Sequence, residues 1–222
     1  MNKQNQLLIC KEFADWKIVF YRFLDNKYNL IDLEKEIYKL PNLENSLGRD
    51  SYIDLLSYNY KDESQFFEIK QLLNSYIDID DFYSWKLCNL FKKKGFNVKN
   101  LIDYNNVELP DLLLELYGGK EFGEIGEGKE QAKSNVTFLK KPLKSDLDDY
   151  WKVLIGEVVQ VGLAHHGNII LFMNNEGVMF IYIEITNNMY IGGNFKTTMS
   201  KLLFGLDYGE LIVKPNDSSS FG

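Results

Sequence analysis

The sequence predicts an α+β protein: an antiparallel sheet packed by helices, preceded by a small all-α module. Three apolar runs, 169–173, 178–185 and 189–191, are rich in the β-branched and aromatic residues that suit strands. Asn and Gly residues separate the runs and tolerate the backbone of tight turns, which predicts a three-stranded antiparallel meander. Further upstream, apolar residues recur at helical spacing, and this pattern predicts the all-α module.

The helical module is predicted over residues 1–78. Phe13, Trp16, Phe20 and Phe23 follow one another at the spacing of a single helix face, so they should form an apolar stripe that packs inward. Further helices are predicted at 31–39, 42–46, 51–58 and 64–76.

The second domain is predicted over residues 79–212, and residues 213–222 are expected to form a flexible tail. The charged stretch 78–81 should cap a helix that continues to Lys94. Asn194 should cap the last helix, which ends at Gly205. Between them we expect a helix over 112–117, strands at 120–125, 136–139 and 153–161, and a short helix starting after Ser145.

Composition and charge narrow the classes of function. The 222 residues carry a net charge of −7, which disfavours binding to nucleic acid or to an anionic membrane and favours a basic partner. The first ten residues lack the apolar run of a secretory signal, so we expect a cytoplasmic protein. Its two cysteines, Cys10 and Cys88, are then expected to be reduced thiols.

Two motifs have residue types that could support chemistry. Residues 123–129 fit the phosphate-binding spacing G-x-x-x-x-G-K, but Glu130 stands where Ser or Thr must reach Mg²⁺, and the loop's carboxylates would repel phosphate. His165 and His166 are adjacent and would point to opposite faces of a strand, with no other ligand at metal-binding spacing. We therefore expect no catalytic residue, no cofactor and no metal site.

A series of motifs over residues 80–206 resembles a known family. In order along the chain these are Gly95-Phe96, LLLELYGGKEFGE, Leu154-Ile155-Gly156-Glu157, Asn174-Asn175-Glu176-Gly177, Tyr190-Ile191-Gly192-Gly193-Asn194-Phe195 and Leu203-Phe204-Gly205. Their order and spacing resemble the third subgroup of the SUKH superfamily, the immunity proteins of bacterial polymorphic toxin systems. Asn174, Phe96 and Leu154 replace an Asp, a Trp and a Pro of the family pattern.

The resemblance implies one antiparallel sheet packed by helices, and a non-enzymatic protein that binds and neutralises a cognate toxin, often a nuclease or deaminase. It names no contact residues. From loop position and acidity alone we expect the toxin to contact Glu121, Glu124, Glu127, Asp148 and Asp149, with Tyr190 as an anchor. Two alternatives stay open: a regulatory or scaffold module unrelated to toxins, and a nucleotide-dependent enzyme that uses the Gly123–Lys129 loop.

Overall fold

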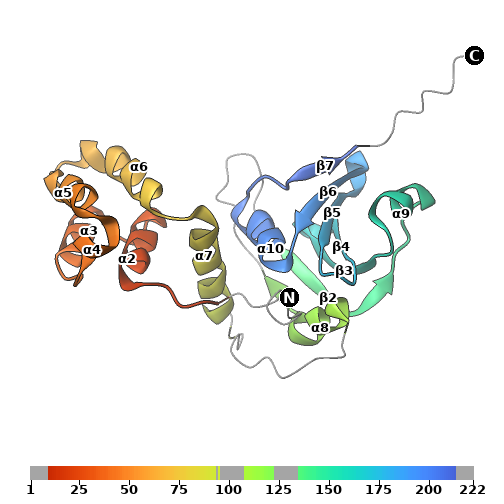
Figure 1. Ribbon diagram of the computed structural model, residues 1–222. Coiled ribbons are helices and arrows are strands. Elements are labelled where there is room, and N and C mark those ends of the chain that lie inside the picture. The colour runs from red at the N-terminus through yellow and green to blue at the C-terminus, as the bar shows by residue number, and fades with distance from the viewer. Residues whose placement is uncertain (1–9, 94, 96–107, 123–134, 214–222) are drawn as a thin grey trace, which may run out of the picture. The chain divides into compact units, whose positions relative to one another are not determined.

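The chain divides into two compact units. Figure 1 shows the computed structural model, which describes residues 10–93, 95, 108–122 and 135–213. A helical unit lies within Cys10–Phe96, and a sheet unit contains the chain from Asn97 to Gly222. The helical unit thus includes helix α7 (Ile79–Lys93), which the sequence analysis assigned to the second domain. A division into independently folding domains after residue 78 stays a prediction.

The helical unit is built from short helices around an apolar core. Phe20 and Phe23 are completely buried, as the apolar stripe predicted, and Ile69 and Leu73 are buried with them. Gly48, with a φ of 84°, separates the helix Leu43–Leu47 from the helix Arg49–Ser57. Before α7 the helices are α2 (Asp15–Leu24), α3 (Leu30–Ile37), α4 (Leu43–Leu47), α5 (Arg49–Ser57), η1 (Glu63–Gln65) and α6 (Phe66–Tyr76).

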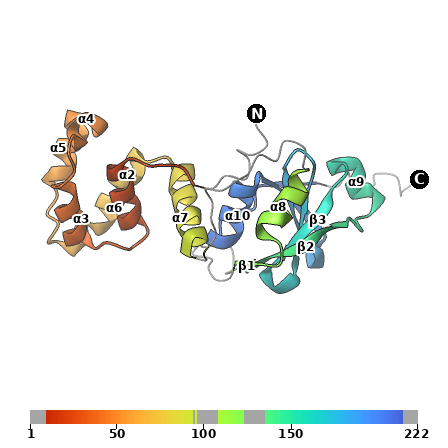
Figure 2. The same cartoon turned by 90° about the horizontal axis from the view of Figure 1, so that it is seen from below.

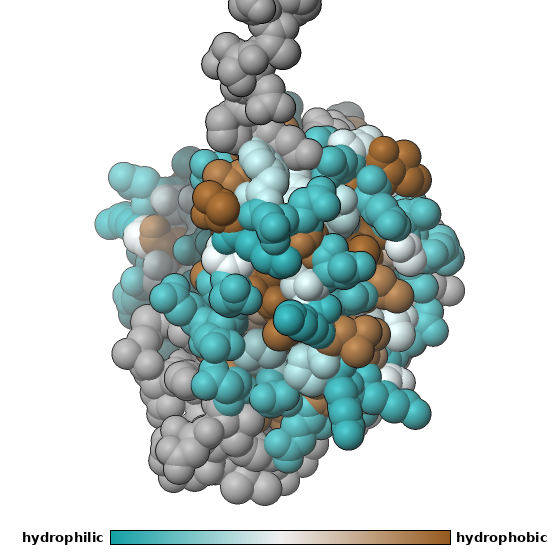
Figure 3. Space-filling model, turned by 90° about the vertical axis from the view of Figure 1, so that its right-hand side faces the viewer, coloured by the Kyte–Doolittle hydropathy of each residue, from teal (hydrophilic) through white to brown (hydrophobic). Residues whose placement is uncertain are grey.

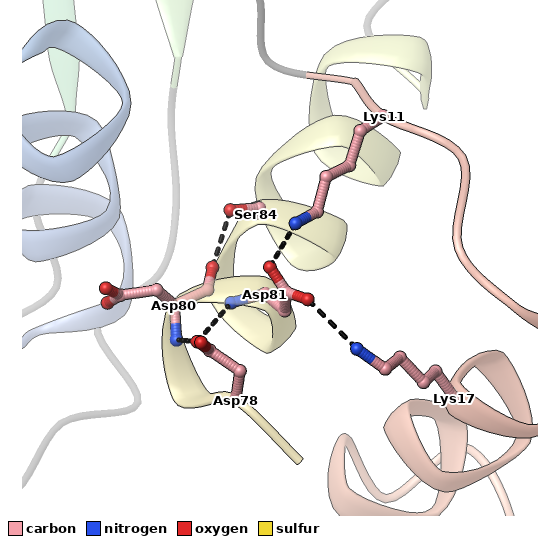
Figure 4. A network of polar contacts seen from close by, with 6 residues as sticks. All are labelled: Lys11, Lys17, Asp78, Asp80, Asp81 and Ser84. Carbon is pink, nitrogen blue, oxygen red and sulfur yellow. Dashed lines mark hydrogen bonds and ion pairs between the residues drawn. The ribbon is translucent and has the colours of Figure 1, made fainter. Parts of the chain in front are cut away.

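The first turn of α7 is held by a network of carboxylates (Figure 4). The Asp78 side chain accepts hydrogen bonds from the backbone N–H groups of Asp80, at 2.8 Å, and Asp81, at 3.1 Å. It thereby satisfies donors that have no partner within the helix. The Asp81 carboxylate forms ion pairs with Lys11 and Lys17, so the segment before α2 and α2 itself are tied to α7.

The expectation of two reduced thiols is wrong for this structure. Cys10 and Cys88 are joined in a disulfide, with their Cα atoms 5.1 Å apart. Their separation of 78 residues in the sequence gave no indication of a pair. The helical fold brings them together because α7 packs beside the segment that carries Cys10, where Lys11 also reaches Asp81.

The sheet unit contains an antiparallel sheet with strand order β1-β2-β3-β4-β5-β6-β7, so each strand pairs with its neighbours in the sequence. The predicted α+β fold with an antiparallel sheet is confirmed. The strands are β1 (Glu121–Phe122), β2 (Val136–Lys144), β3 (Val159–Ala164), β4 (Ile169–Met173), β5 (Met179–Ile183), β6 (Asn188–Gly193) and β7 (Glu210–Ile212). The helices are α8 (Leu109–Tyr117), α9 (Asp149–Ile155) and α10 (Phe195–Phe204), with short turns η2 (His165–Gly167) and η3 (Glu184–Thr186).

Helices α8 and α10 cover one face of this sheet, called here the first face. Figures 1 and 2 both show these two helices close together on the same side of the strands. Tyr117 of α8 stacks on Phe195 of α10 with ring centroids 5.1 Å apart, and both rings lie against Phe138 of β2. The first face is therefore a closed aromatic core.

Helix α9 lies on the opposite, second face of the sheet. Strand register places Phe172 opposite Phe180 on this face, and both are buried in a cluster with Trp151 of α9. The cluster also includes partly buried side chains, among them Ile191 and Ile212. The second face is thus covered less completely than the first, which leaves room for a surface site.

One predicted strand is partly wrong. Residues 153–155, expected to begin a strand, instead form the last turn of α9, and the strand starts only at Val159. The apolar run favoured a strand on composition. The helix is favoured because Trp151 anchors it on the sheet and Gly156, with a φ of 74°, ends it.

Candidate partner-binding site

A pocket of about 350 Å³ lies beside the second face of the sheet. It is lined by Trp151 of α9, residues 186–188 at the end of η3 and the start of β6, and residues 211–213 of β7 and just beyond. Three segments that are far apart in the sequence therefore build it. Strand β7 is the last strand in the sheet order, so the pocket sits at a sheet edge.

Asn187 organises the polar side of this pocket. Its Oδ1 accepts a hydrogen bond from Trp151 Nε1 at 3.2 Å and another from the Tyr182 hydroxyl at 3.1 Å. The Trp151 side chain is only 1% exposed, and a buried indole N–H needs such an acceptor. Asn187 has a left-handed backbone (φ 51°, ψ 40°), which Asn tolerates better than most residues.

Two carboxylates lie near the Tyr182 hydroxyl, which donates to Asn187 of the pocket lining. Asp148 precedes α9 and Glu184 begins η3, and both side chains are exposed. Burial raises the pKa of the Tyr182 hydroxyl, and the nearby negative charges of Asp148 and Glu184 raise it further. In the part of the chain that the structure describes, neither carboxylate forms an ion pair.

Exposed apolar side chains surround the same pocket. Ile185 is 80% exposed, Val213 72% and Leu211 41%. Figure 3 views the side of the molecule that carries α9 and shows apolar residues in brown between polar residues in teal. Exposed apolar side chains of this kind are suited to contact with another macromolecule.

The predicted contact residues that the structure describes lie on different elements. Asp148 and Asp149 adjoin each other at the start of α9, and Asp149 pairs with Lys152 at 3.3 Å. Glu121 lies on β1, where it accepts a hydrogen bond from Asn135 at 3.0 Å.

Tyr190 lies on β6, four strands away from β2, and packs on Tyr208 with ring centroids 5.6 Å apart. Its register partner is Ile181, which faces the first side of the sheet rather than the side that carries Asp148. Glu124 and Glu127 lie outside the described residues, as does the Gly123–Lys129 loop.

Sequence reasoning missed the residues that build the pocket. Trp151 and Asn187 are 36 positions apart, and no spacing rule links them. The apolar run 178–185 predicts Glu184 within a strand, whereas η3 interrupts the run there. The one available signal is the Asn187-Asn188 pair, which by itself predicts only a turn between strands.

His165 and His166 are placed differently from the prediction. They lie in the turn η2 between β3 and β4, both with positive φ, and not on a strand. Asn135 accepts hydrogen bonds from the backbone of both, at 3.0 Å through its carbonyl and 2.8 Å through its side chain. Among the described residues no group of three or more His, Cys, Asp or Glu side chains could hold a metal. Nor does any described helix combine the length and hydrophobicity needed to cross a bilayer.

The fold and the site define a small α+β domain with a pocket of polar and apolar side chains, Trp151 among them, at the edge of an antiparallel sheet. Residues 118–205, from the segment before β1 to the end of α10, match the family described as SUKH-3 immunity protein. This part of the chain is therefore a SUKH superfamily domain, as the resemblance indicated, and the match supports an immunity role. Comparison with curated proteins and with solved structures gave no match.

The family match does not include the whole chain. The helical unit and β7 lie outside the matched residues. The pocket is therefore built partly from the matched domain, through Trp151 and Asn187, and partly from residues 211–213 beyond it.

Proposed function

We propose that this protein is an immunity protein that binds a cognate bacterial toxin in the cytoplasm and blocks it without catalysing a reaction. The observation that carries the proposal is the family match over residues 118–205. Nucleases and deaminases are the toxin activities that the resemblance implies. Inhibition would come from steric occlusion of the toxin's active site or of its substrate groove.

Charge supports a basic partner. The chain carries a net charge of −7, and nuclease toxins need a positive surface to hold nucleic acid. An acidic inhibitor would be steered toward such a surface, and like charge would keep it away from nucleic acid and anionic lipid. We therefore propose a basic protein toxin as the partner.

Co-expression tests this proposal. The full chain would be produced together with the product of any large open reading frame found next to its gene, and growth would be scored with and without the chain. The proposal predicts that the neighbouring protein alone stops growth, that the full chain restores growth, and that the two proteins co-purify. Growth arrest without rescue, combined with no complex, would contradict it. A control strain would carry the chain alone, which should grow normally.

A further inference from the structure

We infer that residues 10–14, called here the arm, are a redox-controlled cover on the aromatic side chains of the helical unit. The disulfide from Cys10 to Cys88 of α7 keeps the arm closed, and reduction of this bond opens it. The inference goes beyond the proposed function, because it concerns the helical unit alone and needs no toxin. Three observations carry it: how the arm is attached, what it covers, and how its bond can be reached.

The disulfide is the strongest attachment of the arm. Residues 10–14 belong to no helix or strand, and three of the five are exposed. Figure 4 shows Lys11 of the arm in its ion pair with Asp81, but the Lys11 side chain is 53% exposed, and ion pairs of exposed side chains contribute little. Phe13 adds a ring contact although it is only partly buried. Without the covalent bond, the arm would therefore depend on weak surface contacts.

A completely buried tyrosine lies against the arm. The Phe13 ring meets Tyr21 edge-on, with ring centroids 5.5 Å apart, and Tyr21 also contacts Phe82 and Trp85 of α7 at 5.6 Å each. Among the described residues, the Tyr21 hydroxyl has no hydrogen-bond partner. An unpaired buried hydroxyl has a cost in free energy that disappears when water reaches it. Opening the arm would relieve this cost, so the closed state needs its bond.

The bond can be broken by thiol–disulfide exchange with a dithiol. Cys10 is partly exposed whereas Cys88 is only 4% exposed, so the attack falls on Cys10 Sγ. Cys88 leaves as a thiolate and takes up a proton, and the dithiol is held to Cys10 as a mixed disulfide. The second thiol of the reductant then displaces Cys10 as a thiol. The chain gains two electrons and two protons, and the dithiol is oxidised to its own disulfide.

The two redox forms should therefore differ in the exposure of one aromatic group. The oxidised chain holds the arm over Tyr21, and the reduced chain exposes this ring to solvent. The cytoplasm, which is the proposed location of the protein, keeps most thiols reduced, and the disulfides that form there are mostly catalytic or redox-sensing. The arm would then be open in an unstressed cell and closed after oxidation.

The solvent accessibility of single tyrosine rings tests the inference. The full chain would carry isotope-labelled tyrosine, and NMR would measure how strongly a soluble gadolinium chelate relaxes each ring signal. The relaxation of Tyr21 should be weak in the oxidised chain and rise several-fold after dithiothreitol is added. Tyr60 is the matched control, because it is also buried and its hydroxyl donates to the Leu55 carbonyl at 2.7 Å. Its ring should stay protected in both forms.

Variants separate the disulfide from the ion pair. Cys10→Ser cannot form the bond, so its Tyr21 ring should be accessible with and without dithiothreitol. Protection of Tyr60 in the same sample shows that this variant is folded. Asp81→Asn loses the ion pair with Lys11 but keeps the bond, so its Tyr21 ring should be protected until dithiothreitol is added. Tyr21→Phe assigns the signal by removing it.

The inference is overturned if Tyr21 stays protected in the reduced chain, because the arm would then remain closed without its bond. It is also overturned if Tyr21 and Tyr60 become accessible together, since the bond would then stabilise the whole helical unit and control no separate opening. Failure of mild oxidation to form the Cys10–Cys88 bond, measured by mass spectrometry, would overturn it as well. None of these results changes growth rescue, so the proposed function is judged separately.

Discussion

At the scale of single residues, Lys201 connects three parts of the sheet unit. Its Nζ on α10 donates to the backbone carbonyls of Gly192, at 2.9 Å, and Tyr208, at 3.0 Å, with Ile191 at 3.5 Å. Burial lowers the pKa of this ammonium, and Asp207 partly opposes that effect. Lys201 is therefore a structural residue that fixes the path of the chain from α10 into β7.

Replacing Lys201 with Met should destabilise the sheet unit by about 1–3 kcal/mol, because partly buried carbonyl groups would lose their donor. Met keeps the apolar stem, so the change isolates the hydrogen bonds. Chemical denaturation followed by Trp151 fluorescence would measure the free energy of unfolding. Lys141→Met, at an exposed position, is the matched control and should change it little. Equal effects of the two substitutions would refute the structural role of Lys201.

Single-residue features could be predicted from the sequence when they act locally. Asn194 caps α10 by accepting from the backbone of Thr197 at 2.9 Å, as predicted. Asn174 replaces an Asp of the family pattern. Its side-chain oxygen accepts a hydrogen bond from the backbone N–H of Val178 at 2.9 Å, so an amide oxygen can take the place of the carboxylate in that turn. The requirement for glycine at position 192 becomes apparent only in the tertiary structure, because a Cβ there would lie 2.6 Å from Thr198 Oγ1.

At the scale of elements, the helical unit depends on cross-links to α7. The disulfide joins α7 to the segment before α2 and closes a loop of 78 residues. Ion pairs from Lys11 and Lys17 to Asp81 act on the same two segments. Covalent and electrostatic links to α7 should therefore contribute separately to stability.

Reduction of the disulfide should lower the free energy of unfolding of the helical unit by about 4 kcal/mol. The bond closes a long loop, so breaking it increases the conformational entropy of the unfolded chain. Denaturation would be followed with and without a thiol reductant, using fluorescence of Trp16 and Trp85. A Cys10→Ser, Cys88→Ser variant should unfold like the reduced chain and should not respond to the reductant. Coincident unfolding curves for oxidised and reduced chains would contradict the prediction.

The Asp81 ion pairs should make a pH-dependent contribution to the stability of the helical unit. Burial acts to raise the pKa of Asp81, but hydrogen bonds and charge from Lys11 and Lys17 outweigh it and hold this pKa below its usual value. Because the folded pKa lies below the unfolded value of about 3.9, the ionised form stabilises the fold above about pH 4. That contribution is lost as the pH falls through the folded pKa.

Asp81→Asn should therefore cost about 1 kcal/mol at neutral pH and progressively less below about pH 4. Melting temperatures of both proteins across this range would show the difference shrink. Asp80→Asn makes the same chemical change at an exposed neighbouring position and serves as the control. A cost for Asp81→Asn that stays constant down to pH 2 would mean that the ion pairs are not its cause.

Elements with a clear period were predicted well, and those decided by tertiary contacts were not. The strands after residue 168 and helix α10 follow directly from alternation, turns and caps. The sequence predicts part of helix α9 as a strand because its apolar run is short. The helix is anchored by Trp151, which packs on strands that follow it in the sequence, and such a contact cannot be predicted from local spacing. The Cys10–Cys88 pair was missed for the same reason.

At the scale of the whole molecule, the fold class could be predicted from the sequence, whereas the candidate site could not. Of the predicted contact residues that the structure describes, Asp148 and Asp149 begin α9, the helix that carries the pocket residue Trp151. The rest of the site depends on strand order, which brings β7 and η3 together with α9. Loop position and acidity alone cannot reveal such an arrangement.

The most direct test is a titration of the toxin's own activity with the purified full chain. A protein that acts by occlusion should lower the residual activity linearly with its molar ratio and abolish it when the toxin is saturated. A small fraction of an equivalent that progressively inactivates all of the toxin would show catalysis and contradict the account. So would full toxin activity in the presence of a large excess of the chain.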